Sequence, residues 1–255
     1  MLLAVDIGNT ETTLGVFEGE KLRITWHIAT DIHRTADEVA SLLISLLDNK
    51  SLQISDIREV SFCSVVPPLT AILEEVVRRY LGISPLVVAA GTKTGVRVCM
   101  DNPKEVGADR IVNAAAAHHL YNGPLIIVDL GTATTFDTVS ENGDYMGGAI
   151  APGIVTATEA MFHKTAMLPR VELMRPERVV GTNTIDAIKS GIIFGYVGLV
   201  EGMVARIKRE LGVQMKTITT GGYAQLIAAE TNIIDEVCPN LTLVGLRLIY
   251  RMNES

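Results

Sequence analysis

The chain has 255 residues, of which 48% are hydrophobic and 20% charged, and its net charge at pH 7 is −7. A mainly disordered protein is excluded by this composition. The acidic balance offers no basic surface for a phosphate backbone, so we expect no nucleic-acid partner. Three widely spaced cysteines and scattered histidines match neither a disulfide framework nor a metal site, and we expect a cytoplasmic protein.

No membrane segment is expected either. The longest nearly apolar run, residues 191–200, is half of the roughly 20 residues that a membrane-spanning helix needs. The run is suited to a buried helix face or to a subunit interface.

The first strand of the chain has a second copy about half a chain away. Residues 2–10 (LLAVDIGNT) return as residues 125–133 (LIIVDLGTA), and both are apolar strands that end in Asp-x-Gly-x. Each half is therefore predicted to begin with a three-stranded meander whose first turn carries an aspartate and a glycine. The further strands of the two meanders are expected at residues 12–17, 22–29, 135–139 and 145–150.

Helices and strands alternate after each meander, which predicts parallel strand pairing through crossover helices. A capping box at Thr35 and Glu38 opens the first helix, which continues to Leu47. Further strands are expected at 59–63, 86–89 and 216–219, and helices after Pro67 and at 106–121, 184–211, 223–230 and 241–252. We place a domain boundary within residues 107–121, giving domains of residues 1–110 and 111–255.

The two Asp-x-Gly turns carry groups that suit a nucleotide. Glycine lets the backbone approach a ligand, and exposed N–H groups with the hydroxyls of Thr10 and Thr132 can hold phosphate oxygens. Asp6 or Asp129 can take Mg²⁺. One such turn alone is more often an ordinary hairpin. Two copies in matching positions favour a triphosphate held between two facing meanders.

These repeated meanders resemble the actin, sugar kinase and chaperone ATPase superfamily. The resemblance implies an α/β fold of duplicated actin-like, ribonuclease H-like domains, each a mixed sheet with helices on both faces. Gly221 and Gly222, between a strand and a helix, resemble the adenosine loop of that superfamily, although the same pattern also forms plain turns.

A narrower resemblance is to the type III pantothenate kinases. Four segments resemble motifs of that family, in order and spacing: residues 6–10 (DIGNT), 102–110 (NPKEVGADR), 129–135 (DLGTATT) and 147–153 (GGAIAPG), with a weaker match at 64–67 (SVVP). The resemblance implies a homodimeric enzyme that phosphorylates pantothenate to 4′-phosphopantothenate with ATP and Mg²⁺, the first step of coenzyme A synthesis.

Asp109 and Arg110 place an acid and a base side by side at a helix start. A carboxylate can accept the hydroxyl proton of an attacking substrate, and a guanidinium can anchor an anionic one. The tetrapeptide alone is more often a helix start, where an aspartate interacts favourably with the helix macrodipole beside a surface arginine. Resemblance to the family assigns Asp109 as the catalytic base and pantothenate binding to Gly107, Ala108, Asp109 and Arg110.

The resemblance also implies roles for residues in the repeated turns. Asp129 would help to bind a monovalent cation, K⁺ or NH₄⁺, and Asp6 would help to bind the Mg²⁺ of Mg-ATP. Thr184 would reach the substrate across a dimer interface, although its segment could be only a helix cap. Met100 would line the pantothenate pocket, where the family often has an aromatic residue. Contacts to ATP are implied for Asp6, Ile7, Gly8, Asn9, Thr10, Glu11, Thr12, Thr13 and Thr132.

Two other functions remain open from the sequence. One is an ATP-binding regulatory protein of the same fold, such as a transcription accessory factor, although the acidic balance speaks against direct DNA contact. The other is a kinase of the same fold that acts on a sugar or a short acid. The segment 102–110 argues against the latter, because it resembles the pantothenate enzymes.

Overall fold

The computed structural model describes residues 1–165 and 167–254. Contacts within the chain separate it into two compact units. The first comprises residues 1–96, residues 101–116 and the segment from Leu241 onward, and the second comprises residues 97–100 and 117–240. The division of the sequence at residue 110 assigned the last helix to the second half, whereas these contacts group it with the first unit.

The sheet of the first unit has the strand order β3-β2-β1-β4-β5. Strand β1 pairs antiparallel with β2 and parallel with β4, so a meander continues into parallel strands as expected. The strands are β1 (Leu2–Ile7), β2 (Glu11–Glu18), β3 (Lys21–Ala29), β4 (Glu59–Ser64) and β5 (Leu86–Val87).

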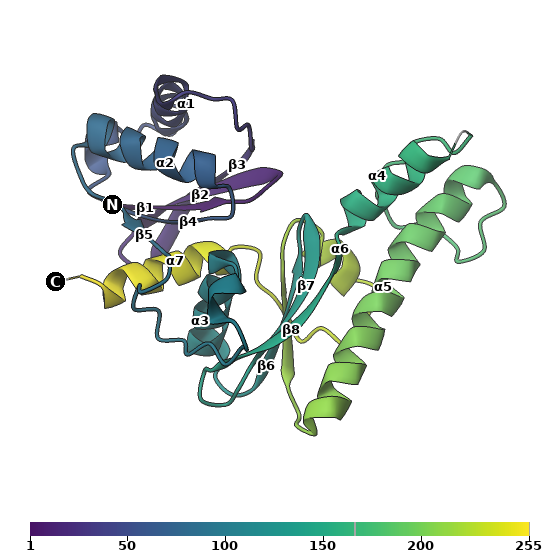
Figure 1. The fold of residues 1–255 in the computed structure, drawn as a ribbon. Coiled ribbons are helices and arrows are strands. Elements are labelled where there is room, and N and C mark those ends of the chain that lie inside the picture. Colours follow the sequence, from purple (N-terminus) through teal and green to yellow (C-terminus); the bar gives the residue numbers. More distant parts are fainter. Residues whose placement is uncertain (166, 255) are drawn as a thin grey trace. The chain divides into compact units, whose positions relative to one another are not determined.

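Helices cover both faces of this sheet (Figure 1). On one face lie α1 (Ala36–Asp48) and α2 (Pro67–Val76), which pack with Leu3 and Val5. On the opposite face lies α7 (Leu241–Met252), which packs with Leu2 and other residues of the second face. The alternation of apolar side chains along β1 therefore buries both of its faces, as expected for a central strand.

The start of α1 confirms the predicted capping box. The Glu38 backbone N–H donates to the Thr35 hydroxyl at 3.4 Å, and the Thr35 backbone N–H donates to Glu38 Oε2 at 2.7 Å. Two backbone donors at the helix start are thus satisfied reciprocally. The hydrogen bonds lower the pKa of Glu38, so its carboxylate stays charged in the cap.

The sheet of the second unit repeats the topology of the first. Its order, β8-β7-β6-β9-β10, matches β3-β2-β1-β4-β5 position by position, with antiparallel pairing within the meander and parallel pairing beyond it. This match confirms the duplicated α/β fold. The strands are β6 (Leu125–Leu130), β7 (Ala133–Val139), β8 (Tyr145–Pro152), β9 (Lys216–Thr220) and β10 (Glu236–Val237).

The longest helix, α5 (Thr184–Leu211), has the bounds that the sequence predicted. It begins where Asn183 accepts a hydrogen bond from the Asp186 backbone N–H and ends at Gly212 in the left-handed conformation. By length and composition α5 could cross a membrane. In the structure Ile193 and Val200 are fully buried in the core of the second unit, which is the position of a core helix.

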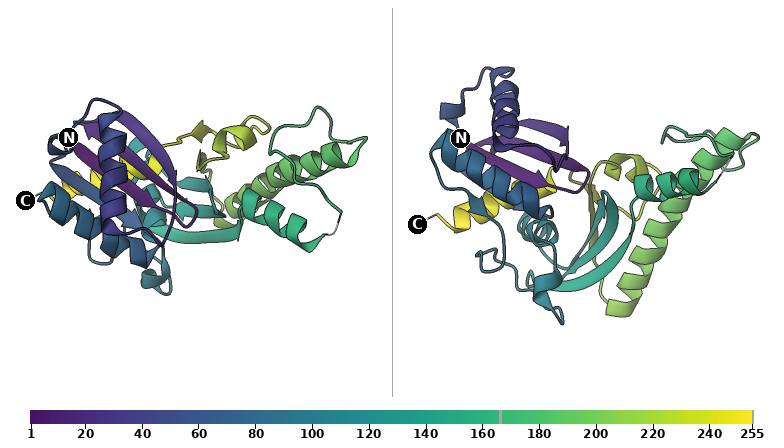
Figure 2. Two further views of the ribbon diagram at one scale, coloured as in Figure 1. Left: turned by 90° about the horizontal axis from the view of Figure 1, so that it is seen from above. Right: turned by 45° about the horizontal axis from the view of Figure 1, so that its top comes forward.

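Helix α4 (Ile154–Lys164), which was not predicted from the sequence, lies beside α5 in Figure 1 and in both views of Figure 2. The remaining helices are α3 (Ala108–Tyr121) and α6 (Ala224–Ala228). Helix α7 crosses α3 closely at Gly245, where a Cβ would overlap the backbone of Val112. This close approach helps to hold the C-terminal helix in the first unit.

Candidate active site

The first predicted phosphate loop joins β1 to β2. The Gly8 backbone N–H donates to the Glu11 carbonyl at 3.0 Å, and this closes the turn. A Cβ on Gly8 would lie 2.8 Å from the same oxygen, so the tight turn requires glycine. Asn9 and Thr10 at the tip are exposed. The loop therefore presents backbone and hydroxyl donors to solvent, where a phosphate could reach them.

Side chains of the segment 6–13 alternate between the two faces of the sheet. Asp6 and Thr13 are cross-strand partners on one face. Ile7 and Thr12 are buried on the opposite face, toward α1 and α2. Of the residues expected to contact ATP, these two can therefore offer only their backbone.

Thr30, directly after β3, holds this loop through hydrogen bonds to its backbone. Its hydroxyl donates to the Gly8 carbonyl at 2.8 Å, and its backbone N–H donates to the Thr10 carbonyl at 3.0 Å. The same hydroxyl lies 2.9 Å from that of Thr12. The sequence reading missed this role, because Thr30 is distant in sequence and belongs to none of the motifs.

Asp6 lies at the centre of a small acidic cluster in the first unit. Cys63, its neighbour on β4, donates its thiol to Asp6 Oδ1 at 3.3 Å. Burial, and then the negative charge of Asp109, raise the pKa of Asp6 to about 7, while the thiol hydrogen bond lowers it. Burial also raises the pKa of the Cys63 thiol, which keeps it in the donating form. The structure thus brings two predicted site residues, Asp6 and Asp109, within electrostatic reach.

Asp109 is held in the first turn of α3. Its Oδ1 accepts a hydrogen bond from the Arg110 backbone N–H at 2.9 Å. A Cβ on Gly107 would overlap the Asp109 carboxylate, so glycine leaves the room that this carboxylate occupies. The orientation of the acid depends on the Gly-Ala-Asp-Arg order that the sequence showed.

This donor set fits Mg²⁺. The negative charge of Asp109 raises the pKa of Asp6, and a cation between two such carboxylates relieves their like-charge repulsion. Carboxylate oxygens are the ligands that Mg²⁺ prefers. No group of three or more His, Cys, Asp or Glu residues that could hold a metal occurs among the residues that the structure describes. The pair therefore suits a magnesium ion that is also held by phosphates, rather than a cage made only of protein.

The second predicted loop joins β6 to β7 and has the same form. The Gly131 backbone N–H donates to the Ala133 carbonyl at 3.1 Å. The Thr132 carbonyl accepts from the Gly153 N–H at 3.1 Å and from the Thr156 hydroxyl at 2.8 Å, and a Cβ on Gly153 would overlap the loop backbone. The N-terminal end of α4 is thereby fixed against this loop. The sequence did not predict this role for Gly153 and Thr156, although Gly153 is the last residue of the motif at 147–153.

Asp129 lies in a cradle formed by glycine. A Cβ on Gly221 would lie 2.7 Å from Asp129 Oδ1 and 2.7 Å from the Leu130 carbonyl oxygen, and Gly221 has φ +93°. A carboxylate and a carbonyl oxygen are hard donors of the kind that K⁺ accepts. The residues present therefore fit the expected monovalent cation.

Met100 and Thr184 both belong to the second unit. A Cβ on Gly147 of β8 would lie 2.8 Å from the sulfur of Met100, so Met100 packs on that strand. Thr184 is exposed at the start of α5 and lines a groove with Thr158 and Met161 of α4. Within the second unit, Thr184 is thus grouped with α4 side chains rather than with the backbone of the second loop.

Comparisons with known proteins agree with the motifs. The sequence profile of the type III pantothenate kinases matches residues 2–206. The chain is 58% identical over 254 residues to a type III pantothenate kinase of Dehalococcoides mccartyi, covering 100% of this chain and 98% of that protein. It is 50% identical over 253 residues to one of Moorella thermoacetica, covering 99% and 100%.

Solved structures show the same fold at low sequence identity. A Campylobacter jejuni protein named for the Baf family of transcriptional activators superposes with a TM-score of 0.61 at 20% identity, covering 98% of both chains. A polyphosphate/ATP-glucomannokinase of Arthrobacter superposes with a TM-score of 0.52 at 13% identity, covering 99% of both chains. These likenesses concern the fold alone and do not favour a regulatory role. The motifs, the duplicated sheets and the 50% to 58% identity to these enzymes over the whole chain show that the chain belongs to the type III pantothenate kinase family.

Proposed function

We propose that this kinase transfers the γ-phosphoryl group of ATP to pantothenate with Asp109 as the general base. The observation that carries the proposal is the Asp6–Asp109 pair, in which the charge of Asp109 raises the pKa of Asp6. In this proposal the two interacting carboxylates have separate tasks. Asp6 stands beside the first phosphate loop, and Asp109 stands at the motif that resembles the pantothenate site.

Asp109 accepts the proton of the 4′-hydroxyl as that oxygen attacks the γ-phosphorus, and ADP leaves. Gly107, Ala108 and Arg110 bind pantothenate, with the guanidinium of Arg110 facing its carboxylate. Met100 lines the apolar part of that pocket, where a flexible thioether adapts to the substrate. Mg²⁺ beside Asp6, when bound, supplies charge that stabilises the phosphates in the transition state.

The ATP contacts follow the two loops. Gly8, Asn9 and Thr10 offer backbone N–H groups and a hydroxyl to phosphate oxygens, and Thr132 does the same from the second loop. The side chains of Asp6, Glu11 and Thr13 lie on the face of the sheet opposite to α1 and α2 and face the nucleotide in this proposal, whereas Ile7 and Thr12 act through their backbone. Asp129 holds the monovalent cation, K⁺ or NH₄⁺, and the Gly221 cradle supports this assignment.

The enzyme acts as a cytoplasmic homodimer in this proposal. Gly191, Gly195 and Gly198 lie about one helical turn apart on α5, and a Cβ on any of them would meet no atom within 4 Å. Such an open, small-residue face suits the close approach of a second helix. Thr184, exposed at the start of the same helix, would then reach the substrate of the partner subunit.

ADP release by the purified enzyme tests the proposal. The assay contains ATP and Mg²⁺, with and without pantothenate, in K⁺ and then in Na⁺ buffer. Release that needs pantothenate and is faster in K⁺ is the expected result. Folded protein that shows no stimulation by pantothenate in either buffer would refute the substrate, and equal rates in K⁺ and Na⁺ would refute the cation at Asp129.

A further inference from the structure

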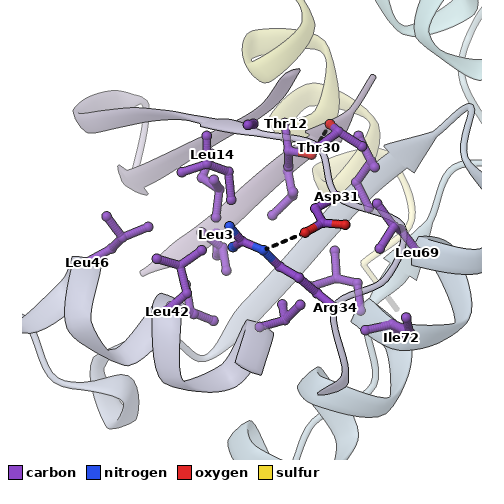
Figure 3. Close-up of a pocket in the computed structure, with 17 residues that line it drawn as sticks. Leu3, Thr12, Leu14, Thr30, Asp31, Arg34, Leu42, Leu46, Leu69 and Ile72 are labelled. Carbon is purple, nitrogen blue, oxygen red and sulfur yellow. Dashed lines mark hydrogen bonds and ion pairs between the residues drawn. The ribbon is translucent and has the colours of Figure 1, made fainter. Parts of the chain in front are cut away.

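The first unit contains a cavity on the face of the sheet opposite to Asp6. It has a volume of about 60 Å³ and lies between the sheet and helices α1 and α2 (Figure 3). Its walls are aliphatic side chains from three strands and both helices, among them Leu3, Leu14, Leu42 and Ile72. A space of this kind favours an apolar occupant over water, which would find few hydrogen-bond partners there.

The polar residues of the cavity gather where β3 runs into α1. They are Thr12, Thr30, Asp31 and Arg34. Figure 3 shows the Arg34 side chain reaching toward the aliphatic walls near Leu3, with Asp31 beside it. Arg34 Nε lies 4.0 Å from Asp31 Oδ2, a long ion pair.

The N–H groups of the Arg34 guanidinium are largely unused by the protein. In residues 1–165 and 167–254 it donates no hydrogen bond to another protein group, and its side chain is 33% exposed. The neighbouring carboxylates already accept backbone N–H groups: Asp31 accepts from His33 at 3.0 Å and Glu38 from Thr35 at 2.7 Å. Arg34 therefore interacts with Asp31 through a long ion pair and with Glu38 through its charge, but it donates no short hydrogen bond to either carboxylate. Its planar fork of N–H groups at the edge of an apolar cavity can still take a further carboxylate, the group that it binds best.

We propose that this cavity binds a short aliphatic carboxylate, with its hydrocarbon tail among the leucines and its carboxylate on Arg34. The volume sets the size of the tail. A cavity of about 150 Å³ holds benzene, which is roughly 25 Å³ per carbon, so this cavity has room for about two to three carbon atoms. Butyrate, with three carbons beyond its carboxyl group, matches both the room and the charge.

A ligand in this cavity would act on the first phosphate loop. Thr12 and Thr30 line the cavity, and the Thr30 hydroxyl donates to the Gly8 carbonyl at 2.8 Å. An occupant that moves or orders Thr30 alters its hydrogen bonds to the carbonyls of Gly8 and Thr10. It therefore alters the position or mobility of the loop that binds phosphate, and with it the KM for ATP. This regulatory effect rests on the proposed function of the loop, whereas binding of the carboxylate does not.

Calorimetry with sodium butyrate at constant ionic strength tests the binding step without turnover. We expect butyrate to bind, and 1-butanol and n-butylamine to bind more weakly. Arg34→Gln should weaken butyrate binding by roughly tenfold, because a charge-assisted hydrogen bond is lost. Val39→Leu, which extends a side chain of α1 at the cavity wall, should weaken it as well. Arg23→Gln, on an exposed arginine of the same unit, is the matched control and should leave binding unchanged.

Thermal unfolding confirms that each variant is folded. No binding of butyrate to the folded wild type overturns the proposal, and so does equal binding of n-butylamine or unchanged binding by Arg34→Gln. Displacement of butyrate by pantothenate would place it in the substrate site and also overturn the proposal. The KM for ATP is then measured at saturating butyrate. A change of at least twofold that needs roughly tenfold more butyrate in Arg34→Gln than in the wild type supports the coupling. An unchanged KM with proven binding refutes the coupling alone.

Discussion

Cys63 donates its thiol to Asp6 across two parallel strands, with its Sγ 3.3 Å from Oδ1. The two residues are 57 positions apart in the sequence, and the pairing of β1 with β4 makes them neighbours. Burial and the negative charge of Asp109 raise the pKa of Asp6. The hydrogen bond from the thiol, although a weak one, stabilises the charged carboxylate and so lowers this pKa. One orientation of the carboxylate is thereby fixed beside the phosphate loop.

Replacing Cys63 should move the titration of Asp6. Cys63→Ala removes the donor, so the pKa of Asp6 rises by about half to one unit, the equivalent of one hydrogen bond. Cys63→Ser keeps a donor and should stay near the wild type. The free energy of unfolding of the ligand-free enzyme is measured against pH, and the pH at which its slope changes reports the pKa of Asp6. An alanine variant that titrates like the serine variant would contradict the role of the thiol.

The titration of Asp6 itself should make the ligand-free enzyme less stable as the pH rises. The pKa of Asp6 is about 7 in the folded state against 3.8 for an unperturbed aspartate, so between pH 4 and 7 the folded state holds more protons than the unfolded state. The free energy of unfolding therefore falls with increasing pH in this window. Between pH 5 and 8 the wild type should lose about 2 kcal/mol more than Asp6→Asn. Urea unfolding without nucleotide or Mg²⁺ at both pH values checks this, and equal losses would rule out the raised pKa.

Asp109→Asn should abolish most of the activity and leave the fold intact. Loss of a positioned general base lowers kcat by about 10²–10⁴. Because the variant also removes a negative charge near Asp6, the pKa of Asp6 should fall, which a merely structural change would not cause. Glu18→Gln, an exposed carboxylate on β2, serves as the control. A kcat within a few-fold of the wild type would remove Asp109 from its role.

Gly221 and Gly222 offer a matched pair for the second unit. Gly221→Ala places a Cβ 2.7 Å from Asp129 Oδ1 at a backbone φ of +93°, so it should cost about 1–3 kcal/mol of stability and reduce activation by K⁺. A Cβ in Gly222→Ala meets no protein atom within 4 Å, so this variant should keep the stability and the K⁺ activation of the wild type, whatever its affinity for the nucleotide. Chemical unfolding and the rate of ADP release against K⁺ concentration measure both effects. Equal behaviour of the two variants would show that the Gly221 cradle does not hold Asp129.

The sequence was sufficient for the duplication and for most of the helices and strands. Apolar strands that end in Asp-x-Gly mark β1 and β6, and a capping residue with a terminal glycine bounds α5, because these signals act through neighbouring residues. The site residues at both loops and at α3 were found through the resemblance of their segments to motifs of the family. Helix α4 was missed, since its start depends on the hydrogen bond of Gly153 to Thr132, in a loop 21 residues earlier.

Only the tertiary structure could decide which side chains share a place. The thiol of Cys63 on Asp6, the hydroxyl of Thr30 on Gly8 and the packing of α7 in the first unit all join distant parts of the chain. So does the cavity beside Arg34, which three strands and two helices enclose. Sequence patterns report on residues within a turn or a strand of each other. Burial, pKa shifts and cavities arise from contacts that form only when the sheet is assembled.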